Sequence, residues 1–140
     1  MSRANATLVD AGPLVALLRA DDRDHAECVR TLRRLRGPLA TTWPPVTEAM
    51  YLLGFSPAAQ EALLKMIERG TVSIAEVNVA DLPRIRWLMR TYRTLRMDLA
   101  DATLVRVAGR ERFSQVFTLD RRDFRVYRVG PKARPLTIIP

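Results

Sequence analysis

The sequence predicts an α/β fold, a single domain in which helices cover both faces of a central parallel sheet. Short apolar, β-rich segments alternate along the chain with longer segments of helical periodicity. This alternation is typical of parallel strands joined by helical crossovers. The 140 residues, 48% of them hydrophobic and 27% charged, are enough for one buried core. We therefore expect one domain over residues 1–140.

The first third of the chain predicts two strands and two helices. Residues 7–9 are apolar and fit a short buried strand, and Gly12-Pro13 begins a helix that runs to Leu18. Asp24 is expected to cap a second helix, with Ala26, Val29, Leu32 and Leu35 as its apolar stripe, before Gly37-Pro38 ends it. Residues 38–43 then fit a second strand.

The middle of the chain predicts two further helices and a third strand. Prolines stand at the head of a helical segment over residues 44–55, where the helix geometry favours them. Ser56 is a good N-cap for the next helix, which ends at Gly70. Residues 71–77 alternate and are β-rich, which indicates a strand.

The last third predicts two helices and two strands. Asp81 is expected to cap a helix that carries Ile85 and Leu88 on its buried side. A second helix is expected over residues 98–112, followed by a strand over residues 115–119. Basic turns and a final strand over residues 136–139 complete the chain.

The net charge of +8 is confined to one part of the sequence. Residues 1–83 hold nine Lys/Arg and ten Asp/Glu, whereas residues 84–140 hold fourteen Lys/Arg and five Asp/Glu. Arginine makes bidentate contacts with phosphate, so this excess favours a nucleic-acid partner. A solvated basic surface is the alternative. Most of these residues are Arg84, Arg86, Arg90, Arg93, Arg96, Arg110, Arg112, Arg121, Arg122, Arg125 and Arg128.

Several classes of protein are excluded by composition. A single cysteine, Cys28, forms no disulfide within the chain, and one histidine, His25, leaves no zinc cluster to build. No uncharged stretch is long enough to span a bilayer. Asp10 falls where a signal peptide would keep its uncharged segment. We expect a cytoplasmic protein without a membrane partner.

Carboxylates follow the strands of the predicted sheet at the edge where α/β proteins bind ligands. Asp10 ends the first strand, although Gly12 and Pro13 already make the turn there, and Asp120 ends the fourth. Glu48 lies in the first turns of the helix after the second strand. The full set expected at this edge is Asp10, Glu48, Asp98, Asp101, Asp120 and Asp123.

Each carboxylate also has an ordinary structural explanation. Asp98 fits a helix N-cap, and Asp101 and Glu48 suit the positive end of a helix dipole. Asp123 could instead pair with Arg121 or Arg122 on the surface. Taken together, like charges gathered at one edge repel one another and require a cation to neutralise them.

Oxygen ligands alone indicate a hard divalent ion, Mg²⁺ or Mn²⁺. The chemistry that fits such a site is hydrolysis of a phosphodiester bond, in which the ion activates water and neutralises charge on the phosphate. An acidic cavity by itself repels RNA, so the basic C-terminal part is expected to supply the contacts to phosphate.

With these residues identified, the sequence resembles the PIN-domain ribonucleases, and most closely the VapC toxins of toxin–antitoxin pairs. The resemblance runs through "LVDAGPLVALL", "TEAMYLL", "MDLADATLVRVA" and "FTLDRRDF" in that order. It implies a PIN-like domain over the whole chain, a metal-dependent endoribonuclease activity, a homodimer and a small inhibitory antitoxin of the VapB type.

The same resemblance assigns roles to individual residues. It implies that Asp10, Glu48, Asp101 and Asp120 are the four catalytic acids and metal ligands. The auxiliary residues that it implies are Asp98, Asp123 and, as a hydroxyl near the metal, Thr118. Asp98 and Asp101 compete for the third acidic position, and "LADATLV" favours Asp101 because it is the more family-like part of that segment.

Two alternatives to a toxin nuclease remain open at this point. One is a catalytically inactive PIN-like module that binds RNA or a protein through its arginines. The other is a housekeeping ribonuclease that matures ribosomal RNA. Cleavage with and without EDTA separates the first from a nuclease, and growth arrest on expression separates the second from a toxin.

Overall fold

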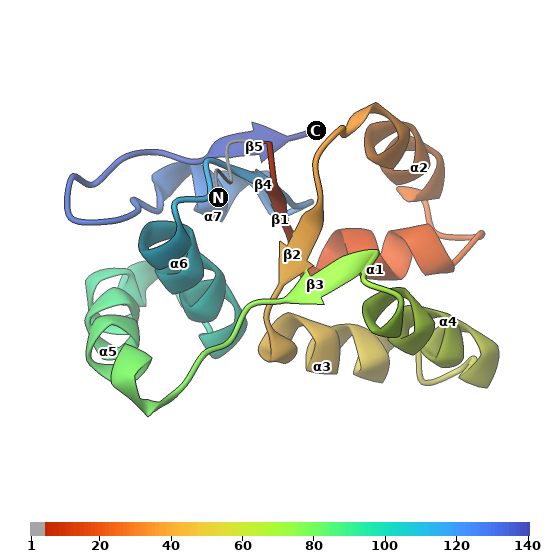
Figure 1. The fold of residues 1–140 in the computed structure, drawn as a ribbon, viewed down its shortest axis with the longest axis horizontal. Helices are drawn as coiled ribbons and strands as arrows, with labels where there is room; N and C mark the ends of the chain where they lie inside the picture. Colours follow the sequence, from red (N-terminus) through yellow and green to blue (C-terminus); the bar gives the residue numbers. More distant parts are fainter. Residues whose placement is uncertain (1–4) are drawn as a thin grey trace.

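Five parallel strands form one sheet in the order β3-β2-β1-β4-β5 in the computed structural model, which describes residues 5–140 (Figure 1). The strands are β1 (Thr7–Val9), β2 (Leu39–Thr41), β3 (Val72–Ile74), β4 (Gln115–Phe117) and β5 (Thr137–Ile139). Leu8 of the central strand pairs with Ala40 on one side and with Val116 on the other. The parallel sheet predicted from the sequence is confirmed. The first four residues of the predicted domain lie outside the described residues.

Seven α-helices and two short 3₁₀ helices connect these strands within residues 5–140. They are α1 (Ala11–Leu18), α2 (His25–Arg34), α3 (Trp43–Leu52), α4 (Pro57–Glu68), η1 (Val79–Asp81), α5 (Leu82–Thr91), η2 (Arg93–Leu95), α6 (Leu99–Glu111) and α7 (Arg121–Val126). The sequence predicted basic turns where α7 lies. That prediction was wrong because α7 has only six residues and buries only Phe124, which leaves too little periodicity to detect.

The sheet has a separate hydrophobic core on each face, and side chains of successive strand residues enter the two cores alternately. Leu8 and Val116 pack in the core that α5, α6 and α7 cover. Val9 and Phe117 pack in the core that α1 to α4 cover. Figure 1 shows these two groups of helices on opposite sides of the strands. The period of two along a strand therefore divides the chain into three layers, as the fold prediction required.

The buried stripe of α2 differs from the one predicted. Cys28 is fully buried, with Leu32 and Leu35 partly buried beside it, whereas Ala26 is exposed. Cys28, Leu32 and Leu35 follow the spacing i, i+4, i+7, so they share one side of the helix. Ala26 lies outside that spacing because it stands two residues before Cys28, which places it on the opposite side of the helix.

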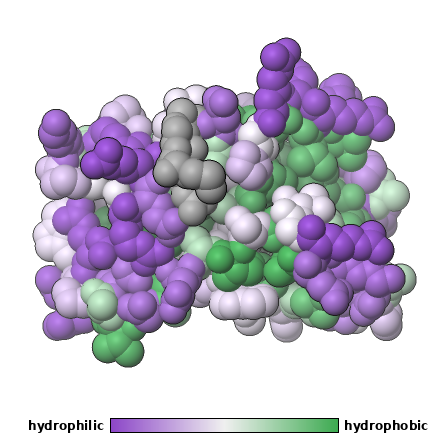
Figure 2. Space-filling model, viewed as in Figure 1, coloured by the Kyte–Doolittle hydropathy of each residue, from purple (hydrophilic) through white to green (hydrophobic). Residues whose placement is uncertain are grey.

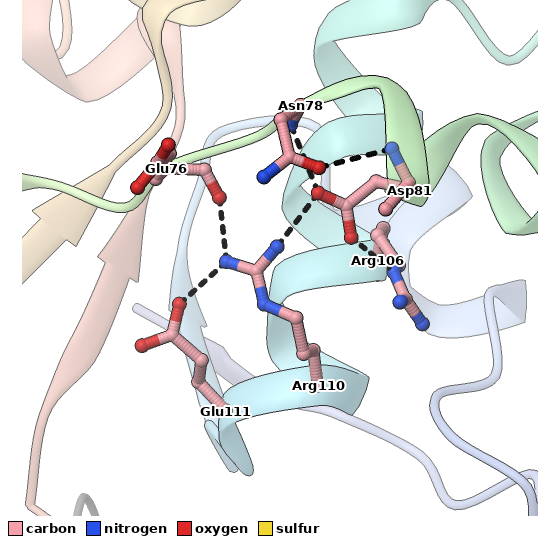
Figure 3. Close-up of polar contacts among 7 residues, drawn as sticks. Glu76, Asn78, Asp81, Arg106, Arg110 and Glu111 are labelled. Atoms are coloured by element: carbon pink, nitrogen blue, oxygen red, sulfur yellow. Dashed lines mark hydrogen bonds and ion pairs between the residues drawn. The ribbon is translucent and has the colours of Figure 1, made fainter.

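Asp81 does not cap α5 with its side chain, contrary to the prediction, because arginines of α6 bind it instead (Figure 3). Its Oδ1 accepts a hydrogen bond from Nε of Arg106 at 2.7 Å, and its Oδ2 accepts one from Nη1 of Arg110 at 2.8 Å. Oδ2 also accepts the backbone N–H of Asn78 at 3.0 Å. Asp81 therefore joins the beginning of α5 to the second half of α6.

None of the helices within residues 5–140 combines the length and the apolar character that crossing a membrane requires.

Candidate active site

The strand order reverses beside β1, which places a crevice at the carboxyl ends of β1 and β4. The chain passes from β1 outward to β2 and β3, and then returns to β4 on the other side of β1. Ligands of open α/β sheets bind at such a point. The backbone N–H of Asp10 donates to the carbonyl oxygen of Phe117 at 3.0 Å and so extends the pairing of the two strands. The side chain of Asp10 therefore begins at this crevice.

A cavity of about 320 Å³ opens there and is predominantly acidic. It is lined by Asp10, Ala11, Gly12, Glu48, Asp98, Asp101, Leu119 and Asp120. Five of the six acids expected from the sequence thus line one cavity, and its lining includes neither lysine nor arginine. Asp123 is not part of the lining, and its backbone N–H donates to Oδ1 of Asp120 at 3.4 Å.

Several of these acids also cap the helices that begin at the cavity. Oδ1 of Asp10 accepts the N–H of Ala11 at 2.8 Å at the start of α1, and Oδ1 of Asp98 accepts the N–H of Asp101 at 2.8 Å at the start of α6. The sequence predicted a capping role for Asp98 but none for Asp10. The structure shows that Asp10 also caps a helix, which gives this carboxylate a structural role that the sequence analysis missed. The positive ends of α1 and α6 partly compensate the acids.

Thr118 lies beneath the cavity and connects two of its acids. The buried hydroxyl of Thr118 donates to Oδ2 of Asp10 at 3.0 Å and accepts the backbone N–H of Asp120 at 2.9 Å. The ends of β1 and β4 are thereby fixed to each other through one side chain. The role that the family resemblance implies for Thr118, a hydroxyl near the metal, stays a prediction.

Burial raises the pKa of Asp10 to about 6. The hydrogen bonds from Ala11 and Thr118 oppose this shift, while the charges of Glu48 and Asp120 add to it. The Glu48 pKa is raised first by burial and then by Asp98. The Asp120 pKa is also raised, first by burial and then by the charge of Asp123.

Asp101 has the more strongly raised pKa, at about 8. Burial is the largest cause, and the charges of Asp10 and Asp98 follow it. The hydroxyl of Tyr127 donates a hydrogen bond of 2.9 Å to Oδ2 of Asp101, which lowers the pKa again in part. Sequence reasoning missed Tyr127, since it lies 26 residues from Asp101 and no motif marks it.

The two candidates for the third acidic position differ in burial and in hydrogen bonding. Asp98 is exposed and uses one oxygen to cap α6. Asp101 is half-buried, and its carboxylate accepts the hydroxyl of Tyr127. Both line the cavity, so Asp101 is the deeper ligand candidate and Asp98 the peripheral one.

No ion pair neutralises these acids within residues 5–140. Arg121 pairs with Glu27, at 2.6 Å between Nη2 and Oε1, so the alternative of a pair between Arg121 and Asp123 is not realised. Part of the arginine excess is also structural. Arg110 binds Asp81, and Nη1 of Arg128 donates to backbone carbonyl oxygens, including that of Arg125 at 2.7 Å.

The donor chemistry of the cavity fits a hard divalent ion, but its carboxylates are not drawn together as a closed cage. Among residues 5–140, no three His, Cys, Asp or Glu side chains are arranged to hold a metal ion by themselves. The four acids that the family resemblance implies as metal ligands therefore do not form a ready-made cage in the described part of the chain. Mg²⁺ keeps several waters and uses one or two carboxylates, which this arrangement can supply.

An apolar groove of about 360 Å³ lies next to the acidic cavity along the start of α6. Its lining consists of Trp43, Pro44, Ala75, Val77, Asn78, Val79, Leu82, Ile85, Leu99 and Thr103. Leu99 directly follows Asp98, which lines the cavity. Trp43 is 55% exposed. Trp43, the first residue of α3, therefore lines an open groove and is not enclosed in either core.

Comparison with known proteins yields one sequence relative and two structural neighbours of note. The chain is 28% identical to ribonuclease VapC26 of Mycobacterium tuberculosis (strain ATCC 25618 / H37Rv) over 135 residues, which cover 95% of this chain and 99% of the relative. No family model matches.

The structural neighbours share the fold at low sequence identity. One is the crystal structure of Mycobacterium tuberculosis VapC20, described as a sarcin-ricin loop cleaving toxin, with a TM-score of 0.79 and 16% identity over 96% of this chain and 99% of that one. The other is a toxin–antitoxin complex from Klebsiella pneumoniae, with a TM-score of 0.63 and 22% identity over 84% of this chain and 89% of that one.

Proposed function

We propose that this protein, which is a PIN-domain protein of the VapC type, is an endoribonuclease that acts as the toxin of a toxin–antitoxin pair. The observation that carries this function is the cavity at the strand-order reversal, where five carboxylates without a paired cation meet. Carboxylates that repel one another without a paired cation are found mainly at binding or catalytic sites.

We assign Asp10, Glu48, Asp101 and Asp120 as the catalytic acids that would hold Mg²⁺ or Mn²⁺. When bound, the ion supplies activation of water and neutralisation of charge on the phosphodiester. Asp98 and Asp123 would act as auxiliary acids at the periphery. Thr118 would hold the Asp10 carboxylate in place, since its hydroxyl donates to Oδ2.

Free arginines near the cavity would bind the phosphates of the RNA. Arg86, Arg90, Arg93 and Arg96 are exposed, and their side chains have no ion pair or hydrogen-bond partner among residues 5–140. The segment that carries them leads directly into Asp98 at the start of α6. RNA that follows these side chains along the segment would arrive at Asp98, which lines the acidic cavity.

The apolar groove beside the cavity supports protein partners. An exposed apolar surface of this kind is typical of a protein–protein interface. We propose that an antitoxin of the VapB type and a second copy of the chain are the two partners, that the antitoxin blocks the cavity, and that the protein acts in the cytoplasm on cellular RNA.

The decisive experiment is RNA cleavage by the purified protein with Mg²⁺ or Mn²⁺, and with EDTA. Asp10→Asn and Asp101→Asn should each abolish cleavage while circular dichroism stays unchanged, and Asp21→Asn, an exposed acid outside the cavity, should cleave as the wild type does. RNA binding that persists in EDTA, with no cleavage of any RNA, would instead identify an inactive binding module.

Two further measurements separate a toxin from a housekeeping ribonuclease. A toxin arrests growth on expression, and a co-expressed antitoxin encoded beside it relieves the arrest. Mapping of the cleavage ends across total cellular RNA then identifies the substrate. A protein that cleaves precursor ribosomal RNA without arresting growth would support the housekeeping alternative.

A further inference from the structure

Tyr127 immediately follows α7 and is completely buried, yet its hydroxyl reaches an acid that lines the cavity. The ring is 0% exposed. Its hydroxyl donates to Oδ2 of Asp101 at 2.9 Å. A buried phenol requires a hydrogen-bond partner, and here the partner is one of the proposed catalytic acids instead of a backbone carbonyl.

Two neighbouring aromatic rings fix the direction of this hydroxyl. Tyr92 packs edge-on against Tyr127 with ring centroids 5.0 Å apart, and Phe124 does the same at 5.1 Å. Such edge-to-face contacts leave a buried ring little freedom to turn. Tyr92 is itself anchored, since its hydroxyl accepts the backbone N–H of Arg128 at 2.9 Å. The Tyr127 hydroxyl is thereby held on Asp101 by packing.

Asp101 has few other restraints on its carboxylate. It forms no ion pair among residues 5–140, and the charges of Asp10 and Asp98 act on it repulsively. Within that part of the chain, Tyr127 is the side chain that donates a hydrogen bond to it. The bond engages Oδ2 and leaves Oδ1 available. A neutral donor orients the carboxylate without cancelling its charge, as an arginine would.

We propose that Tyr127 is a positioning residue that fixes the Asp101 carboxylate for binding a divalent cation. This inference rests on the proposed nuclease function and adds a residue to it. In other metal sites, hydrogen-bond partners of the ligands orient them, and their loss typically costs 10- to 100-fold in metal affinity or activity. Tyr127 would act on the cation through Asp101 without touching the RNA.

The test compares Tyr127→Phe with Tyr92→Phe in the full-length protein. Each substitution removes one hydroxyl from the same aromatic cluster and keeps the ring, but only the first hydroxyl touches a site acid. The dissociation constant for Mn²⁺ is measured without RNA from the electron paramagnetic resonance signal of free Mn²⁺. Cleavage kinetics give kcat and KM separately, and thermal melts report stability.

We expect Tyr127→Phe to weaken Mn²⁺ binding by about 10- to 100-fold and to lower kcat while KM for RNA stays within about twofold. Tyr92→Phe should retain wild-type Mn²⁺ affinity and kcat. Excess Mn²⁺ should restore most of the kcat of Tyr127→Phe, which lost packing would not allow.

Two results would overturn the inference. One is wild-type Mn²⁺ affinity and kcat in Tyr127→Phe, and the other is an equal loss in both variants, which would trace the effect to the aromatic cluster. If the wild type binds Mn²⁺ but cleaves no RNA, the proposed function fails, and the Mn²⁺ measurement still decides the role of Tyr127.

Discussion

The hydroxyl of Thr118 donates a 3.0 Å hydrogen bond to the Asp10 carboxylate across 108 residues of sequence. The same oxygen accepts the N–H of Asp120 at 2.9 Å. One hydroxyl therefore sets the spacing between two of the proposed catalytic acids, which lie at the ends of adjacent strands. Removal of this hydroxyl should therefore lower both the stability of the protein and its cleavage activity.

Thr118→Val should destabilise the protein by about 1–3 kcal/mol, because a buried hydrogen bond to a charged group is lost. Cleavage should also fall, since Asp10 loses its side-chain donor. Thr31→Val is the matched control, because the buried hydroxyl of Thr31 has no hydrogen-bond partner within residues 5–140. That variant should be neutral or stabilising in urea denaturation. Equal destabilisation by the two substitutions would contradict the role of Thr118.

The metal-free protein should lose stability as pH rises from about 4 to about 8. The pKa of Asp10 is raised from 3.8 to about 6 and that of Asp101 to about 8, so the folded state binds these protons more tightly than the unfolded chain. Their contribution is fully present below pH 3.8 and is lost as pH rises through the folded values.

Thermal melts in EDTA at about pH 5 and pH 8 measure this dependence. Asp101→Asn should flatten it and raise the melting temperature at pH 8, because the most strongly repelled charge is gone. Asp21→Asn should keep the wild-type slope. A wild-type melting temperature that does not fall between the two pH values would refute the electrostatic account of the cavity.

Mg²⁺ or Mn²⁺ should raise the melting temperature of the wild type, and more so at about pH 8 than at about pH 6. A ligand that binds only the folded state stabilises it, and protons compete with the cation for the carboxylates. Asp101→Asn should lose most of this gain. A gain of equal size in that variant would locate the cation elsewhere.

Asp81→Asn should cost about 1.5–3 kcal/mol, because Arg106 and Arg110 lose charge-assisted hydrogen bonds to a buried carboxylate while Arg110 keeps its pair with Glu111. Asp21→Asn provides the exposed comparison, as Asp21 is 75% exposed in its 2.8 Å pair with Arg19. That loss should be much smaller, because solvent screens an exposed ion pair. Equilibrium unfolding in urea distinguishes the two, and similar losses would contradict the structural role of Asp81.

Replacement of Arg86 and Arg90 by alanine should weaken RNA binding and reduce its salt dependence. For single-stranded RNA, each lost phosphate contact lowers the slope of log K against log salt by about 0.7. Fluorescence anisotropy with a short labelled RNA, in the Asp101→Asn background, measures the slope. Arg33 and Arg34 of α2 are the control pair, since α2 lies on the opposite side of the sheet from α5 (Figure 1). An equal effect of both pairs would indicate nonspecific attraction.

The surface over α5 and α6 in the left part of Figure 2 is mainly hydrophilic, whereas apolar side chains gather toward the helices on the other side of the sheet. This distribution agrees with the arginine-rich character of residues 84–140 in the sequence. The sequence gives the number of arginines, but it does not show which of them are bound to acids in the folded protein. Arg110 and Arg121 are bound to acids, whereas Arg86 and Arg90 have no such partner among the described residues.

The sequence alone determined the fold class and the edge of the sheet where the acids gather. Strands and helices have different hydrophobic periods, so their alternation predicts a parallel sheet, and a residue that ends a parallel strand must lie at its carboxyl edge. Asp10, Asp98, Asp101 and Asp120 could therefore be placed together without coordinates. The helix α7 escaped prediction because six residues are too few to show a period.

Only the tertiary structure decided which side chains touch one another. The contact of Tyr127 with Asp101, the use of Asp81 by two arginines of α6, and the exposure of Trp43 all depend on how helices pack across the sheet. Packing sets distances between residues far apart in sequence, and a local pattern of residue types holds no information about those distances. The raised pKa values of Asp10 and Asp101 have the same origin, because burial is a property of the folded chain.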